Sequence, residues 1–166
     1  MKKVLEVTIL GHPVGAARPR VVMKRDRSGV MSYMPKEHVR WEKKASLAAM
    51  ATLIQAPGGG SRIQPRPLTG PVGLTLLAIH PRPGRLRRKM DTRDRVRCTG
   101  KPDLDNVLKL AMDALSKAKV YRDDNQVCLV RAEAWYQEIG DHAVGGKAPD
   151  AEPTRVVVCV FDLEAA

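Results

Sequence analysis

The chain has 166 residues, 43% of them hydrophobic, which is enough for one domain with one buried core. Its formal net charge of +11 favours a polyanionic partner, and nucleic acid fits this charge better than a membrane does. Three cysteines without a Cys-x-x-Cys spacing argue against a zinc site, and no apolar run is long enough for a signal peptide or a transmembrane helix. We therefore expect a single cytoplasmic domain over residues 1–166.

The N-terminal half predicts a strand, a basic segment and a long helix. Residues 4–10 are rich in β-branched side chains, which is typical of a strand. Residues 14–33 predict a loop or a loose hairpin that turns at 28–29, and it is either a solvated basic loop or a phosphate-binding arm. A helix is expected over 35–55, because proline suits its first position.

The C-terminal half predicts a second helix among three strands. Strands are expected over 72–79, 127–137 and 154–163, and the helix over 103–118. The order is therefore β, α, β, α, β, β. An α+β two-layer fold buries both helices most simply, with one mixed β-sheet of about four strands and the two main helices packed on one face.

The helix over 103–118 begins at a conspicuous acidic pair. Its apolar stripe follows helical spacing and consists of Leu104, Val107, Leu108, Ala111 and Leu115. Pro102 disfavours helix before it, so Asp103 is expected to be the N-cap, with its carboxylate accepting a bond from an early helical amide. Asp103 and Asp105 can converge only if the first is extended while the second lies in the first turn. Lys109 follows Asp105 by one turn, on the same face.

Two further carboxylates, Asp123 and Asp124, follow this helix in a polar turn. Mg²⁺ prefers oxygen ligands, and a metal held by carboxylates can polarise a phosphodiester and activate water. A nearby lysine can stabilise the charge that develops on the phosphate. Spacing alone leaves a plainer alternative open, in which the acidic residues are a helix cap, a surface pair with Lys109 and an ordinary turn.

Residues 81–101 are strongly basic. Nine basic residues stand against Asp91 and Asp94, so the net charge of the segment is 9 − 2 = +7. Such a run is usually a solvated loop, but its place directly before the acidic pair suits a segment that guides phosphates. The basic residues are Arg82, Arg85, Arg87, Arg88, Lys89, Arg93, Arg95, Arg97 and Lys101.

The ordered motif Lys-Pro-Asp-Leu-Asp-Asn at 101–106, followed by Lys109, by Asp-Ala-Leu at 113–115 and by Val-Tyr-Arg-Asp-Asp-Asn-Gln-Val at 120–127, closely resembles the RusA family of Holliday-junction resolvases. These enzymes are often carried by prophages. The N-terminal part, with Gly-His-Pro at 11–13 and Ala-Arg-Pro-Arg at 17–20, resembles a branch of this family found in phages of Gram-positive bacteria. The likeness weakens at 56–70, 82–99 and 140–153.

This resemblance implies an Mg²⁺-dependent endodeoxyribonuclease, with Mn²⁺ as a substitute, that resolves four-way junctions by paired symmetric nicks. It implies that Asp103, Asp105 and Asp124 hold the metal, with Asp123 as a fourth ligand or a supporting group, and that Lys109 contacts the scissile phosphate. It also implies a homodimer, because the junction is two-fold symmetric. DNA contacts are expected from Arg18, Arg20, Arg82, Arg85, Arg87, Arg88 and Lys101.

Two alternatives belong to other classes of function. The first is a less selective Mg²⁺-dependent nuclease that acts on flaps, forks or duplex, and the arginine-rich residues 82–99 are consistent with a broader substrate choice. The second is a basic nucleic-acid-binding module without catalysis. Cleavage of a junction beside matched duplex separates all three.

Overall fold

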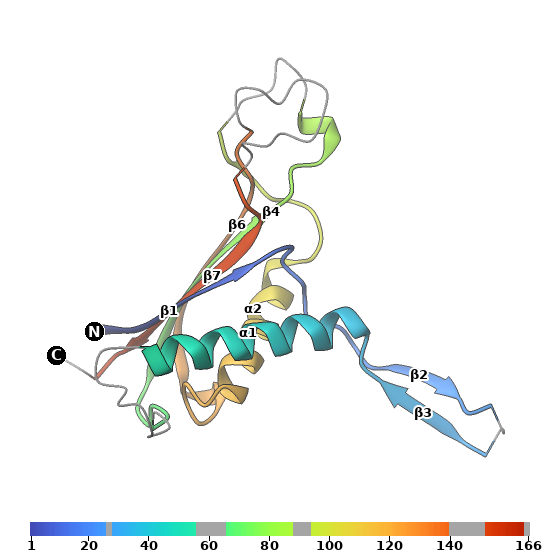
Figure 1. Ribbon diagram of the computed structural model, residues 1–166, viewed down its shortest axis with the longest axis horizontal. Helices are drawn as coiled ribbons and strands as arrows, with labels where there is room; N and C mark the ends of the chain where they lie inside the picture. The colour runs from blue at the N-terminus through green and yellow to red at the C-terminus, as the bar shows by residue number, and fades with distance from the viewer. Residues whose placement is uncertain (26–27, 56–65, 88–93, 140–151, 165–166) are drawn as a thin grey trace.

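In the computed structural model, which describes residues 1–25, 28–55, 66–87, 94–139 and 152–164, one sheet forms the body of the molecule (Figure 1). Its five strands lie in the order β1, β7, β4, β6, β5. Neighbours run antiparallel except β4 and β6, which are parallel and are joined through the second helix. The strands are β1 (Lys2–Leu10), β4 (Val72–His80), β5 (Val96–Arg97), β6 (Val127–Tyr136) and β7 (Arg155–Asp162).

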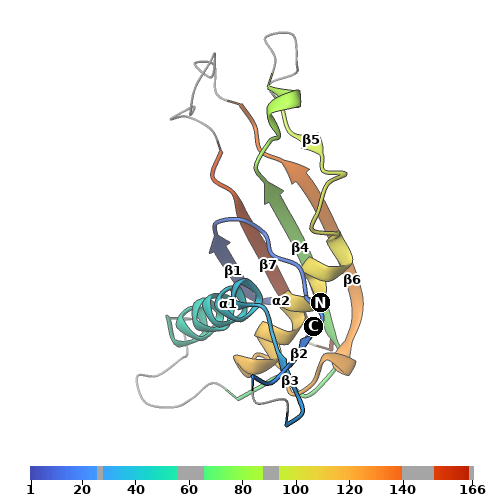
Figure 2. The same ribbon diagram turned by 90° about the vertical axis from the view of Figure 1, so that its right-hand side faces the viewer.

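Both helices, α1 (Lys36–Gln55) and α2 (Leu104–Lys117), lie on one side of this sheet (Figures 1 and 2). Side chains alternate across a strand, so every second residue of β1 and β7 faces the helices. Val7 pairs with Val158, and both are buried. The predicted α+β fold with two helices on one face is therefore confirmed. No helix in the described ranges combines the length and apolarity that crossing a membrane requires.

The core between the layers is built mainly from small aliphatic side chains, as the low aromatic content requires. The helices contribute Trp41, Ala45 and Ala49 from α1 and Val107, Leu110, Ala111, Ala114 and Leu115 from α2. The strands contribute Leu5, Val7, Ile9, Val72, Leu74, Leu76, Ala78, Val156, Val158 and Val160.

The sheet has one strand more than the four or so expected. The additional strand, β5, is only two residues long and lies inside the basic segment, pairing with the end of β6. So short a strand shows no hydrophobic periodicity, which explains why the sequence did not predict it. Two 3-10 turns, η1 (Gly84–Leu86) and η2 (Asp124–Gln126), complete the described elements of the body.

The segment before α1 forms a separate two-stranded hairpin, β2 (Arg20–Met23) with β3 (Val30–Tyr33), which confirms the predicted loose hairpin. We call residues 20–33 the arm. Figure 1 shows the arm extending away from the sheet, beyond the start of α1. The arm therefore contacts the body mainly through the chain at its two ends.

The chain leading into the arm passes directly over the start of α2. The amide of Ala16 donates to the carbonyl of Asn106 at 2.8 Å. A Cβ atom on Gly15 would lie 2.9 Å from the Cβ of Pro102 and 3.0 Å from that of Asn106, so only glycine allows this close approach. The base of the arm and the beginning of α2 are thus packed against each other.

Candidate functional site

Asp103 immediately precedes α2 and has the extended geometry that the sequence analysis required, with φ −65° and ψ 144°. Its backbone carbonyl accepts a bond from the amide of Val107 at 3.1 Å. Its side chain makes no capping hydrogen bond, so the expectation that the carboxylate caps the helix is wrong. An exposed carboxylate that is not used for capping is available to bind a ligand.

Asp105 lies in the first turn of α2 and is also exposed. The amide nitrogen of the Asn106 side chain lies 3.4 Å from its Oδ1 atom. In the described part of the chain no ion pair joins Asp105 to Lys109, although the two are one turn apart and both exposed. The plainer interpretation, a helix cap beside a surface ion pair, therefore describes neither carboxylate.

In the second acidic pair, only Asp123 caps a helical turn. The carboxylate of Asp123 accepts a bond from the amide of Asn125 at 3.0 Å and caps η2, and Gln126 accepts in return from the amide of Asp123. The Asn125 N–H, and then a bond shared with Asp124, lower the pKa of Asp123 below its usual value. The side chain of Asp123 thus stabilises the turn, whereas the side chain of Asp124 is exposed and does not cap η2.

The turn that carries Asp124 is fixed to the body from two sides. The side chain of Gln126 donates to the carbonyls of Leu68 and Gly70, at 3.1 and 2.8 Å. The hydroxyl of Tyr121 donates to the carbonyl of Met112 at 2.9 Å. Burial, and then the negative charges of Asp124 and Asp113, raise the pKa of Tyr121 well above its usual value, so this hydroxyl stays protonated.

The two acidic pairs lie at opposite ends of α2. Asp103 and Asp105 lie at the start of the helix, Asp123 and Asp124 follow its last residue, and the fourteen residues of the helix correspond to about 21 Å along its axis. Figure 1 shows α2 in yellow and orange on the helical side of the sheet. Within the described residues, no three His, Cys, Asp or Glu side chains gather closely enough to hold a metal ion. The donor types suit Mg²⁺, but one chain presents two separate pairs and not a single cluster.

The expected DNA-contacting residues fall into three groups. Arg18, Arg20, Arg85, Arg87 and Lys101 are exposed. Arg88 lies outside the described residues. Arg82 is buried, with 1% of its surface exposed, and it donates to the backbone carbonyl of Asp94, while its own carbonyl accepts from Arg87 Nε at 2.7 Å. Burial removes Arg82 from the set of DNA contacts and makes it part of the loop's framework.

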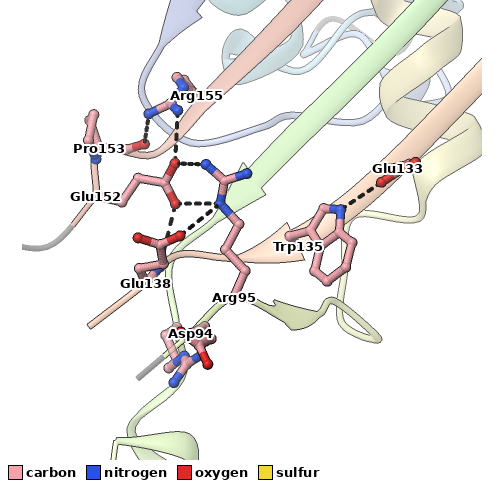
Figure 3. A network of polar contacts seen from close by, with 9 residues as sticks. Asp94, Arg95, Glu133, Trp135, Glu138, Glu152, Pro153 and Arg155 are labelled. Atoms are coloured by element: carbon pink, nitrogen blue, oxygen red, sulfur yellow. Dashed lines mark hydrogen bonds and ion pairs between the residues drawn. The ribbon is translucent and has the colours of Figure 1, made fainter. Parts of the chain in front are cut away.

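Two more arginines of the basic segment, Arg95 and Arg97, also contribute to the fold. Arg95 forms a double contact with Glu152, whose Oε1 also accepts from Arg155 at 2.8 Å (Figure 3). Burial raises the pKa of Glu152, but the hydrogen bond and charge of Arg95 act the other way and leave it below its usual value. Arg97 stacks on the Trp135 ring, with 3.8 Å between guanidinium carbon and ring centroid. Arg95 is therefore paired with a carboxylate and Arg97 is stacked on an aromatic ring, so neither charge of the basic segment is free of contacts with the body.

Two histidines, His38 and His80, are buried in the body. His80 is buried at the end of β4, and its pKa is lowered by burial and then by the charge of His12. His38 was not singled out. It is buried in the first turn of α1, where its Nδ1 accepts from the amide of Ala17 at 3.1 Å. A histidine at a helix start gives no sequence signal for such a contact.

Comparison with known proteins gives one family and one relative. Residues 11–144 match the family described as Endodeoxyribonuclease RusA. A Bacillus subtilis (strain 168) protein described as "Uncharacterized protein YqaN" is similar to this chain, with 29% identity over 142 residues. The alignment covers 81% of this chain and 89% of that protein. The description of that protein states no activity.

Proposed function

Because the chain belongs to the RusA family of endodeoxyribonucleases, we propose that it resolves four-way DNA junctions by paired symmetric nicks. The observation that carries the proposal is the acidic pair Asp103 and Asp105. Both side chains are exposed, neither is used as a cap, and Lys109 stands one turn away in a chain of net charge +11. This combination suits a site that receives a phosphate and a divalent cation together.

Nucleases of this family generally depend on a divalent metal. For this chain the proposed metal is Mg²⁺, with Mn²⁺ as a substitute, and the proposed ligands are Asp103, Asp105 and Asp124. The bound ion supplies Lewis-acid activation of the phosphodiester and of the attacking water. Lys109 contacts the scissile phosphate and stabilises its developing charge. Asp123 acts through the geometry of η2, which places its neighbour Asp124.

The separation of the two acidic pairs bears on the oligomeric state. Among the residues of one chain that the structure describes, no three acidic side chains gather into a single group, so one chain by itself does not complete the proposed site. Two copies related by a two-fold axis can place the Asp124 of one copy beside the Asp103 and Asp105 of the other, and the operation creates two equal sites. We therefore propose a homodimer whose metal sites are shared between copies, which also matches the two-fold symmetry of a four-way junction.

The first test is cleavage of a synthetic mobile four-way junction in Mg²⁺, beside a linear duplex of matched sequence. We expect symmetric nicks in the junction alone and none from Asp103→Asn. Tight junction binding without cutting in Mg²⁺ or Mn²⁺ would identify a binding module. Equal cutting of the duplex would identify a less selective nuclease.

The shared site is tested by mixing inactive variants. Asp103→Asn and Asp124→Asn, inactive alone, form mixed dimers in which one site is fully wild type, so nicking should return to about one quarter of the wild-type rate. The nicks should be unpaired. The matched control mixes Asp103→Asn with Asp105→Asn, which lie at the same end of α2, and no mixed dimer then has an intact site. Failure of the first mixture, or recovery in the control, contradicts the shared site.

Lys109→Ala separates binding from chemistry. We expect junction affinity to change little and the cleavage rate to fall by about a hundredfold or more, since loss of one charge-stabilising group typically has that effect. Single-turnover cleavage with saturating enzyme measures it. A normal rate would exclude Lys109 from the reaction.

A further inference from the structure

The arm carries apolar side chains on both of its faces, and all eight of its strand residues are exposed. Val21, Met23 and Val30 share one face, and Val22, Met31 and Tyr33 share the other. These six side chains are between 37% and 67% exposed. A two-stranded hairpin is at best marginally stable alone in water, so six exposed apolar side chains on an extended arm indicate a binding role.

We propose that the arm is a wedge that inserts apolar side chains between base pairs at the branch point of the DNA. The inference rests on the proposed function and adds to it the element that recognises the branch. Proteins that kink DNA combine basic residues with apolar side chains that enter a base step. Unstacking is easiest where pairing or stacking is already interrupted, so a wedge favours a branch point over a continuous duplex.

The charge around the arm favours DNA as the occupant of its surface. Residues 18–33 contain five basic residues against Asp26, a net charge of 5 − 1 = +4. The phosphates of DNA attract such a segment, and this charge complementarity favours DNA as the occupant. The five basic residues are Arg18, Arg20, Lys24, Arg25 and Arg27.

The size and attachment of the arm suit this role. Each strand of the arm has four residues, which span about 13 Å in extended conformation. A two-stranded ribbon is narrow enough to enter a major groove on the way to the branch. The contact between Ala16 and Asn106 joins the base of the arm to the helix turn that holds Asp105. The wedge and the acidic pair are thus held in a defined relation, so a cut can be placed at a fixed position relative to the branch.

The test uses a four-way junction with 2-aminopurine at the branch point, in buffer without divalent metal. Binding of wild-type protein should raise the 2-aminopurine fluorescence, because the base loses its stacking partner. Val22→Ser combined with Met31→Ser should abolish that rise and lower the ratio of junction affinity to duplex affinity by about tenfold or more, with duplex affinity unchanged. The matched control is Leu47→Ser with Met50→Ser, which removes two exposed apolar side chains from α1 and should change neither quantity.

The outcomes separate the wedge from other roles of the arm. An unchanged fluorescence rise and affinity ratio in the arm variant overturn the wedge while leaving the nuclease intact. An equal loss of junction and duplex affinity without a fluorescence change shows groove binding and also overturns it. A changed molar mass in light scattering shows that the arm binds a second copy, with the same consequence. If wild-type protein shows no preference for branched DNA, the result contradicts both the proposed function and the wedge that rests on it.

Discussion

The pair β1–β7 and the pair β2–β3 are both antiparallel and both rich in valine, yet they have opposite environments. In β1–β7 one face is covered by the helices, and Val7, Ile9 and Val158 are buried. In β2–β3 neither face is covered, and every strand residue is exposed. The same residue types therefore stabilise the fold in one pair and remain available for contact with another molecule in the other.

The difference shows why composition alone does not identify a core. A β-branched residue favours a strand in either place, because its preference is for a pleated surface. Whether the side chain contributes hydrophobic free energy to folding depends on what lies above it. In this molecule the helices cover the sheet and leave the arm uncovered, so the two pairs can be altered independently.

The largest expected effect comes from truncating one apolar side chain in each pair. Ile9→Ala should lower the free energy of unfolding by about 2–5 kcal/mol, because it leaves a cavity under the helices. Met31→Ala, which removes a comparable volume from the arm, should change it by no more than about 0.5 kcal/mol. Urea denaturation of the two variants measures both values. A large loss in Met31→Ala would mean that the arm is packed in solution.

A second, intermediate effect concerns charge. Arg18→Gln with Arg20→Gln should make the dependence of log affinity on log salt shallower by nearly 2, since each phosphate contact contributes about 0.9 to the slope. Lys3→Gln with Arg131→Gln removes the same charge from the sheet, where both side chains pair with glutamates, and should leave the slope unchanged. Junction binding titrated at four or more salt concentrations compares them. Equal salt slopes in the two double variants would mean that Arg18 and Arg20 contact no more phosphates than Lys3 and Arg131 do.

The smallest effect is expected at the ion pairs that hold the ends of β5, β6 and β7. The pKa of Glu152 lies below the ordinary 4.5 in the folded protein, so its contribution to stability is present above that pH and is lost as the pH falls through the lowered value. Glu152→Gln should cost up to about 1 kcal/mol at neutral pH, and the difference from wild type should vanish well below pH 4. Thermal unfolding across pH 3–7 measures it. A constant difference at all pH values would assign the effect to shape and not to charge.

The sequence predicted the elements with strong periodicity and the acidic residues with a fixed spacing. Both helices and the four longer strands of the body lie within a few residues of their expected bounds. The sequence could not show that the side chain of Asp103 makes no capping hydrogen bond, that Arg82 is buried, or that Asp123 is the residue that caps η2. Each of these depends on how side chains are oriented in three dimensions, and neither periodicity nor charge counting contains that information.

The contact between the base of the arm and the first turn of α2 has a thermodynamic consequence. The arm, proposed to bind DNA, and Asp103 and Asp105, proposed to bind the metal, lie on two segments joined by the Ala16–Asn106 bond and by the close approach of Gly15. In a closed cycle, the factor by which DNA tightens the metal equals the factor by which the metal tightens DNA. The affinity for a divalent ion, measured with and without an uncleaved four-way junction, therefore measures how strongly metal binding and junction binding are coupled.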